Sequence, residues 1–266
     1  MIVDGLLLLK AILLGILEGM TEFLPVSSTG HLIIARDLLG FTGENSNTFV
    51  IFIQLGSILG VVWLYRRKVT QVAMTLDQPA SRRFVLNLLI AFLPAAVIGL
   101  LFHGAIKTYL FNPVNVAGAL IVGGILILLI ERRARAPRIH SVDDIRPLDA
   151  FKVGLAQCCA LYPGVSRSGA TIMGGLLSGL SRTAATEFSF FLAIPTMFAA
   201  TLYELWQSRD LLHAGDALIL AAGFIAAFLS AMLVVRLFLA YVARHDFSAF
   251  AYYRIGFGLL VLAYFW

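Results

Sequence analysis

The chain has 266 residues, of which 60% are hydrophobic and 13% charged, and its mean hydropathy is +0.90. Soluble globular proteins have about 45–50% apolar and about 25% charged residues, so this composition excludes a soluble protein and indicates an integral membrane protein. The net charge of +5 is spread too diffusely to indicate a nucleic-acid partner, which leaves membrane lipids as the expected surroundings.

The N-terminal apolar segment contains two carboxylates and then breaks at a proline. Glu18 and Glu22 are four residues apart, which places both on one helix face about one turn apart. Pro25 ends this helix, since a residue before proline is disfavoured in helical geometry. A charge buried in a bilayer costs at least ~2.5–3.5 kcal/mol, so the two acids predict a functional site.

A hydroxyl-rich loop follows Pro25 and leads into a second helix. Ser27, Ser28 and Thr29 lie where hydroxyls cap free backbone N–H groups, and the start of a helix attracts phosphate. His31 follows directly, so its position favours a functional role over that of an ordinary satisfied polar residue.

Six longer apolar runs each have about the 20 residues that a helix needs to cross a bilayer. They lie at 49–65, 84–104, 114–130, 187–206, 216–240 and 247–266. Basic residues concentrate after the first run, after the third run and before the last run. These residues are Arg66, Arg67, Lys68, Arg82, Arg83, Arg132, Arg133, Arg135, Arg138, Arg146, Lys152 and Arg244. In contrast, the connections at 105–113 and 207–215 contain one lysine or arginine each, Lys107 and Arg209. The positive-inside rule therefore places the basic connections in the cytoplasm.

A second hydroxyl-rich loop, Pro163–Thr171, lies between the third and fourth runs. The segments beside it, 149–162 and 168–180, each have about 13 residues, or ~20 Å as helix, which is too short to span a membrane. This pair of short helices is therefore predicted to form a re-entrant hairpin, whose broken tip must be buried in protein or face a watery cavity. The helix before Pro25 is long enough to reach across, so the same hairpin is predicted there only from the internal repeat described next.

A shift of 139 residues brings the two loops into register and predicts an internal repeat. The informative matches are Gly15 with Gly154, Ser27 with Ser166, Gly30 with Gly169, and Gly40 with Gly179. Because three spans, an odd number, follow each hairpin, the second copy must run in the opposite direction across the membrane. The tips of the two hairpins are then expected to meet inside the bilayer.

The predicted fold is an all-α polytopic membrane protein with two inverted repeats, each a re-entrant helical hairpin plus three transmembrane helices. Repeat 1 covers about residues 1–131, a cytoplasmic loop covers 132–148, and repeat 2 covers about 149–266. Together they form a single membrane domain, whose first hairpin opens outward and whose second opens inward.

The second loop adds an arginine to the same hydroxyl pattern. The planar guanidinium of Arg167 suits bidentate binding of phosphate oxygens. Ser166, Ser168 and Thr171 are candidate phosphate ligands, although such hydroxyls equally often only cap or join membrane helices. Arg254, inside the last span, is assigned as a second phosphate contact. The alternative is that it pairs with another group of the protein and has a purely structural role. The two carboxylates would repel an anion unless they hold a divalent cation or take up a proton.

At these residues the sequence resembles the undecaprenyl-diphosphate phosphatase family, also known as bacitracin-resistance proteins. The stretch from Glu18 to Leu32 resembles the family's acidic motif and serine loop, and Pro163 to Thr171 resembles its second motif. The resemblance also reaches Phe49 to Ser57, Phe111 to Gly124 and Glu187 to Pro195, and so covers essentially the whole chain.

The resemblance implies hydrolysis of undecaprenyl diphosphate, a polyprenyl lipid, to the monophosphate. It further implies a multi-pass protein of the bacterial inner membrane with a site facing the periplasm, and activity that depends on Mg²⁺ or Ca²⁺. Carried onto this chain, Ser28 is the nucleophile or a close phosphate ligand, and Arg167 stabilises the transferring phosphoryl group. Glu22 activates Ser28 or, with Glu18, holds metal, and His31 serves as acid or base. Ser27 and Thr29 are further phosphate ligands.

Two other classes of protein remain open at this point. A transporter or flippase of a phosphate-bearing lipid or anion also uses inverted repeats with broken helices, but it needs no nucleophile. A structural membrane protein would leave three buried charges and two matching loops without explanation. The sequence does not fix the oligomeric state, and a homodimer is one arrangement that it allows.

Overall fold

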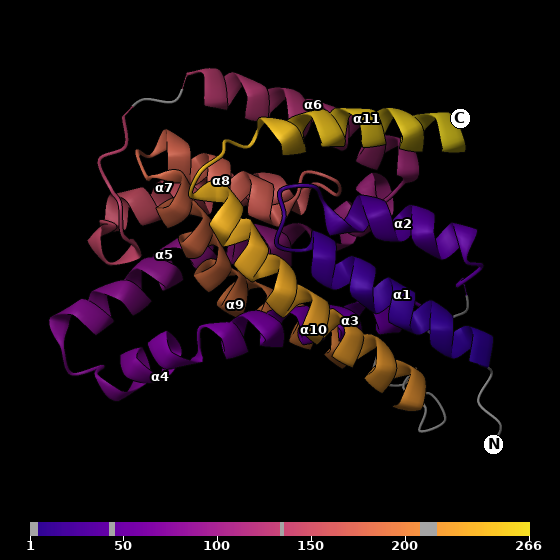
Figure 1. Cartoon of the computed structure of the whole chain (residues 1–266), viewed down its shortest axis with the longest axis horizontal. Helices are drawn as coiled ribbons and strands as arrows, with labels where there is room; N and C mark the ends of the chain where they lie inside the picture. Colours follow the sequence, from indigo (N-terminus) through magenta and orange to yellow (C-terminus); the bar gives the residue numbers. More distant parts are fainter. Residues whose placement is uncertain (1–4, 43–45, 134–135, 208–216) are drawn as a thin grey trace.

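The computed structural model describes residues 5–42, 46–133, 136–207 and 217–266, and these segments are almost entirely helical (Figure 1). Within them there is no β-strand, only an isolated bridge between Ile139 and Leu180. Arg135, Arg209 and most of the 207–215 connection, which entered the topology prediction, lie outside the described residues. The predicted all-α class is confirmed.

In the described part of the chain, six helices are long and apolar enough to cross a membrane. They are α3 (Ser46–Leu64), α5 (Pro79–Ala105), α6 (Pro113–Arg132), α9 (Arg182–Gln207), α10 (Ala217–Val242) and α11 (Ser248–Phe265). Their bounds lie within five residues of the predicted ones. The early start of α5 follows from Pro79, because proline suits the first turn of a helix.

Four further helices form the two predicted hairpins. They are α1 (Gly5–Thr21), α2 (Ser28–Leu38), α7 (Pro147–Cys158) and α8 (Arg167–Leu177). The helices α2, α7 and α8 have 11, 12 and 11 residues. At 1.5 Å per residue they measure roughly 16–18 Å, which is well short of the ~30 Å hydrocarbon core.

Short elements in the connections were not predicted, because none of them carries a long apolar run. They are the helix α4 (Arg66–Met74), the π-helical turn η1 (Ile106–Leu110), and the 3₁₀ turns η2 (Val142–Asp144) and η3 (Cys159–Leu161). The turn η3 extends α7 toward the tip of its hairpin, so the second loop begins after Leu161 rather than after Cys158.

Backbone geometry supports the 139-residue repeat. Ser27 and Ser166 have φ angles of 68° and 75°, and they are the non-glycine residues with positive φ in the described segments. Gly40 and Gly179, also 139 residues apart, have φ angles of 58° and 86°. A positive φ in a serine is strained, so its recurrence at equivalent positions indicates a shared loop conformation rather than biased composition.

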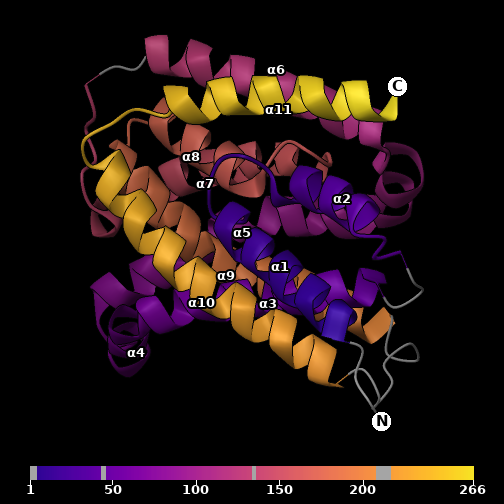
Figure 2. The same ribbon diagram turned by 45° about the vertical axis from the view of Figure 1, so that its right-hand side comes forward.

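Helix packing supports the repeat as well. The first helix of each hairpin lies along a spanning helix of the other copy, α1 against α10 and α7 against α5. The close approach uses equivalent glycines: Gly15 faces the Gly223 carbonyl, and Gly154 faces the backbone of Ala91. The third spans, α6 and α11, lie side by side (Figures 1 and 2). The opposite orientation of the copies across a membrane remains a prediction.

The substitution Gly15→Ala should destabilise the protein, whereas Gly118→Ala should not. A Cβ at Gly15 would collide with the backbone of α10, whereas a Cβ at Gly118 meets nothing within 4 Å in the described structure. Alanine otherwise favours a helix over glycine by roughly 0.5–1 kcal/mol, so Gly118→Ala should be neutral or slightly stabilising. Thermal unfolding in detergent measures the difference, and equal midpoints for the two variants would contradict the close packing of α1 on α10.

Candidate active site

The tips of the two hairpins meet in the interior, as predicted. The Ser168 hydroxyl, at the start of α8, donates a 2.7 Å hydrogen bond to the Leu24 carbonyl in the first loop. Phe23 packs edge-on against Phe190 of α9, with ring centroids 5.7 Å apart. The first tip is therefore held both by the second tip and by the largest hydrophobic cluster of the protein.

Both acidic residues are buried at this meeting point. Glu18 is 0% exposed and Glu22 is 8% exposed. The backbone N–H of Glu22 donates to the Glu18 carbonyl at 2.9 Å, which continues the helical turn beyond Thr21 and keeps both side chains on one face. Among the described residues, neither carboxylate oxygen of Glu18 has a hydrogen-bond partner. A buried carboxylate without partners is costly, so this site is built to receive a cation or a proton.

Ser28 forms the contact expected of an activated nucleophile. Its hydroxyl donates a 2.6 Å hydrogen bond to Oε2 of Glu22. Ser28 is the first residue of α2 and is itself buried. A serine is a weak nucleophile until a neighbouring base takes its proton, and a carboxylate at hydrogen-bond distance supplies such a base.

Arg167 binds the other oxygen of the same carboxylate. Its Nη2 lies 3.2 Å from Oε1 of Glu22, and its Nη1 donates to the Ser189 carbonyl at 3.0 Å. Its Nε is buried without a hydrogen-bond partner in the described segments. Ser28 and Arg167, 139 residues apart in sequence, thus lie on the two oxygens of one carboxylate, and Arg167 keeps a donor available for a ligand.

The two helix starts beside this cluster differ in their caps. The Ser166 hydroxyl caps α8 by accepting from the Gly169 N–H at 3.1 Å. At α2 the corresponding Ser27 makes no capping bond through its side chain. The first N–H groups of α2, next to Ser28, are therefore without a side-chain cap, and such groups bind phosphate oxygens well.

The hydroxyls of the second loop bond to the protein itself, which matches the capping interpretation rather than the assignment as phosphate ligands. Ser166 caps α8, and Ser168 joins the two tips. Thr171 donates to the Arg167 carbonyl at 2.9 Å and pairs with the Ser189 hydroxyl at 2.7 Å. These contacts fix the position of Arg167. Thr29, in the first loop, is half-buried, and its assignment as a phosphate ligand stays a prediction.

The contacts of Arg254 favour the structural alternative over its assignment as a phosphate contact. Its guanidinium is buried, and its three nitrogens donate to five backbone carbonyls at 2.9–3.3 Å. These carbonyls belong to Pro25, Ala119, Leu120, Gly164 and Val165. An arginine has five N–H donors, so none is left for a phosphate. Arg254 instead satisfies carbonyls that the broken helices leave free, and it ties both loops to α6.

His31 is close to the loop but contacts neither Ser28 nor Glu22 by a hydrogen bond. Its Nδ1 lies 2.8 Å from the Ser27 carbonyl, and its Nε2 lies 2.6 Å from the Tyr253 hydroxyl. Of these two candidate bases, Glu22 rather than His31 is hydrogen-bonded to the Ser28 hydroxyl. The expected acid or base role of His31 stays a prediction.

Three residues that the sequence prediction missed complete the site. Tyr253 binds His31, whereas Ser189 and Met197 of α9 bind Arg167. No motif marks Ser189 or Met197, which lie in an apolar run. Tyr253 directly precedes Arg254 in the last span, and a tyrosine in a spanning helix gives no signal of a partner 222 residues away.

Glu18 and Glu22 could hold a divalent cation only if waters or a bound phosphate supplied its remaining ligands. No group of three or more histidine, cysteine or acidic side chains could hold a metal in the described part of the chain. Mg²⁺, however, is commonly bound by one or two carboxylates together with waters and substrate phosphates. The unpartnered oxygens of Glu18, beside Glu22, are suitable for that arrangement.

Comparisons with known proteins agree with this geometry. A family model described as "Bacitracin resistance protein BacA" matches residues 11–260. An undecaprenyl-diphosphatase of Nitrosospira multiformis is 61% identical over 97% of this chain and 95% of the relative. Proteins of the same name from Aromatoleum aromaticum and Dechloromonas aromatica are 59% and 58% identical, over 95% and 98% of this chain and 93% and 95% of the relatives.

Proposed function

This chain belongs to the bacitracin resistance protein BacA family, and we infer that it is an undecaprenyl-diphosphatase, which hydrolyses undecaprenyl diphosphate to undecaprenyl phosphate and phosphate. The observation that carries this function is the placement of Ser28 and Arg167 on the two oxygens of Glu22. The product is the lipid carrier of peptidoglycan synthesis, so the enzyme serves cell wall biogenesis and cell shape and confers bacitracin resistance.

We propose that the protein lies in the bacterial inner membrane with its active site facing the periplasm. The basic connections after α3 and α6 support this orientation by the positive-inside rule. The substrate reaches the site from the surrounding lipid, because its polyprenyl chain remains in the hydrocarbon.

The reaction is a phosphoryl transfer, in which the protein mainly positions groups and neutralises charge. Glu22 takes the proton of the Ser28 hydroxyl, and the Ser28 oxygen attacks the terminal phosphorus. The bond from that phosphorus to the bridging oxygen breaks, and undecaprenyl phosphate leaves. Water then releases phosphate from Ser28. In the alternative route Ser28 orients the attacking water, and Glu22 takes the water proton through the same contacts.

Arg167 stabilises the charge on the transferring phosphoryl group. Its buried Nε is the donor that remains for a phosphoryl oxygen, while its other nitrogens are held by Glu22 and α9. A preorganised cation in a site without water is worth far more than one in solution, because nothing has to reorient during the reaction.

A divalent cation, Mg²⁺ or Ca²⁺, would be held by Glu18 and Glu22 and would supply further charge neutralisation. Without a cation, one of these two acids must be protonated before an anionic substrate enters, because two like charges oppose its binding.

Purified protein should release phosphate from undecaprenyl diphosphate in the presence of Mg²⁺ or Ca²⁺, and chelation with EDTA should lower the rate at least about tenfold. Glu18→Gln should lower it similarly, while Asp77→Asn, which changes an exposed carboxylate in the α4–α5 connection, should not. Colorimetric detection of phosphate gives the rates. Absence of phosphate release with either cation would refute the enzyme function. Full activity in EDTA would show that the reaction needs no divalent cation.

The transporter alternative is disfavoured by the site itself. A carrier needs an anion site but no base beside a hydroxyl, whereas here the Ser28 hydroxyl is 2.6 Å from Oε2 of Glu22. This contact has a direct use in hydrolysis and none in moving an anion.

A further inference from the structure

A chain of polar groups leads from the active-site loop to the surface of α11. The Ser27 carbonyl bonds Nδ1 of His31 at 2.8 Å, and Nε2 of His31 bonds the Tyr253 hydroxyl at 2.6 Å. His31 follows Ser28 by three residues in α2, so both side chains lie on neighbouring positions of one helix face. The chain therefore begins beside the reacting serine.

The far end of this chain is exposed, although its start is buried. His31 is 6% exposed and Tyr253 is 48% exposed. On the same helix Tyr252, Leu259 and Leu260 are exposed as well, and α11 is one of the membrane-spanning helices. The hydroxyl of Tyr253 thus lies at the boundary between the buried site and the surface that faces lipid.

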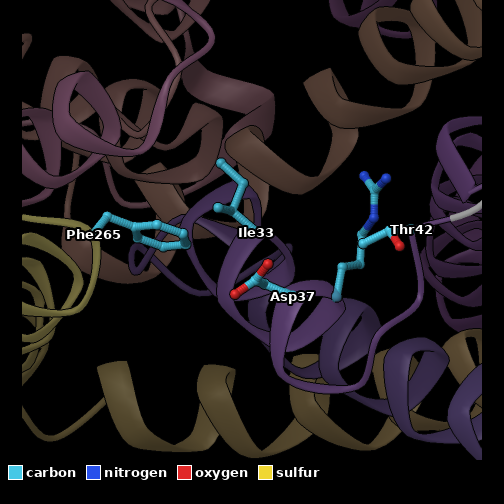
Figure 3. Close-up of a pocket in the computed structure, with 5 residues that line it drawn as sticks. Ile33, Asp37, Thr42 and Phe265 are labelled. Atoms are coloured by element: carbon cyan, nitrogen blue, oxygen red, sulfur yellow. The ribbon is translucent and has the colours of Figure 1, made fainter.

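The seam between α2 and α11 is bridged by side chains and is hollow at one end. Besides the His31–Tyr253 bond, the Tyr264 hydroxyl donates to Oδ2 of Asp37 at 2.8 Å. Beyond that bond lies a hollow of about 190 Å³ (Figure 3). It is lined by Ile33, Arg36, Asp37, Thr42 and Phe265. This hollow lies at the Phe265 end of α11, several helical turns from Tyr253, so a lipid headgroup is expected to reach Tyr253 over the exposed face of α11 rather than through the hollow.

The bonding of His31 decides what the tyrosine can donate. The Ser27 carbonyl only accepts, so Nδ1 of His31 carries a hydrogen. In a neutral histidine, Nε2 therefore accepts from the Tyr253 hydroxyl. In a protonated histidine, Nε2 donates to the tyrosine oxygen, and the phenolic hydrogen becomes free to bind another acceptor.

We propose that Tyr253 binds the lipid-side phosphate of the substrate, and of the lipid phosphate product, with His31 in its protonated form as its positioning residue. This proposal rests on the function inferred above. With the terminal phosphate between Ser28 and Arg167 and the polyprenyl chain in the hydrocarbon, the second phosphate lies between site and membrane, where the Tyr253 hydroxyl is placed.

Inhibition by two different ligands separates this role from a structural one. Undecaprenyl phosphate carries only the lipid-side phosphate, whereas orthovanadate mimics only the terminal phosphoryl group. Tyr253→Phe should raise the inhibition constant of undecaprenyl phosphate about tenfold, the effect of one hydrogen bond to a charged group. The inhibition constant of orthovanadate should change less than twofold. The matched control Tyr252→Phe should change neither constant.

Either of two results would overturn the proposal: an unchanged inhibition constant for undecaprenyl phosphate in Tyr253→Phe, or an equal loss of inhibition by both ligands. Tyr253→His, which restores a donor, should recover part of the affinity for undecaprenyl phosphate if Tyr253→Phe folds poorly, and no recovery would count against the role. Failure of wild-type protein to release phosphate would refute the proposed function instead, so the two failures are distinguishable.

Discussion

Ser28→Ala should lower phosphate release from undecaprenyl diphosphate by about a thousandfold or more, the usual loss when a nucleophile is removed from an otherwise intact site. The hydroxyl is the group that Glu22 can activate, at 2.6 Å, and alanine leaves Oε2 of that carboxylate without its hydrogen-bond partner, while Arg167 still binds Oε1. Orthovanadate binding should survive, because Arg167 and the first N–H groups of α2 remain in place. The measurements are kcat from phosphate release and the inhibition constant of orthovanadate.

Ser57→Ala is the matched control for this change. Ser57 is a fully buried serine of α3 whose hydroxyl, within the described segments, donates to the Ile53 carbonyl of its own helix alone, at 3.4 Å. Its replacement should leave kcat within about twofold, since serine-to-backbone bonds within a helix contribute little. Rapid hydrolysis by Ser28→Ala would eliminate Ser28 as nucleophile and shift the chemistry to a water activated by Glu22.

Arg254→Lys should destabilise the protein by about 3 kcal/mol or more and lower activity at least about a hundredfold, although Arg254 binds no phosphate. Lysine has three donors where arginine has five, so at least two of the five buried carbonyls lose their partner. In a membrane no water replaces those bonds. Because the loops that carry Glu22 and Arg167 are tied together through Arg254, their loosening misplaces the catalytic groups.

The control for this prediction is Arg236→Lys, in which an exposed arginine of α10 changes in the same way. It should keep the wild-type unfolding temperature and rate. A wild-type unfolding midpoint in Arg254→Lys, combined with a large loss of orthovanadate affinity, would reverse the interpretation. It would restore Arg254 to the phosphate site.

Residues of the two loops made most of the architecture predictable. Hydrocarbon tolerates prolines, hydroxyls and charges only for a reason, so the breaks at Pro25 and Pro163 stood out from an apolar background. Short helices beside the second break predicted a hairpin there, and the 139-residue register, with Ser27 matching Ser166, predicted the same arrangement in the first copy. The structure has short helices at both breaks and positive φ angles at Ser27 and Ser166, which is consistent with the repeat, and it places Ser28, Glu22 and Arg167 together.

Other parts of the site could not be predicted, because they depend on which groups are left unsatisfied after folding. An arginine in a span suits a phosphate and a set of free carbonyls equally well, so only the contacts of Arg254 distinguish the two. The hydroxyls of Ser166, Ser168 and Thr171 raised the same ambiguity. The contact of His31 with Tyr253 joins distant helices, and no local pattern marks such a pair.

A structure with bound orthovanadate would show whether both loops act on one phosphoryl group. We expect the Ser28 oxygen and the Arg167 guanidinium both to contact the same vanadate, with Glu22 still beside Ser28. Vanadate held by one loop alone, or bound away from Ser28 and Arg167, would contradict it.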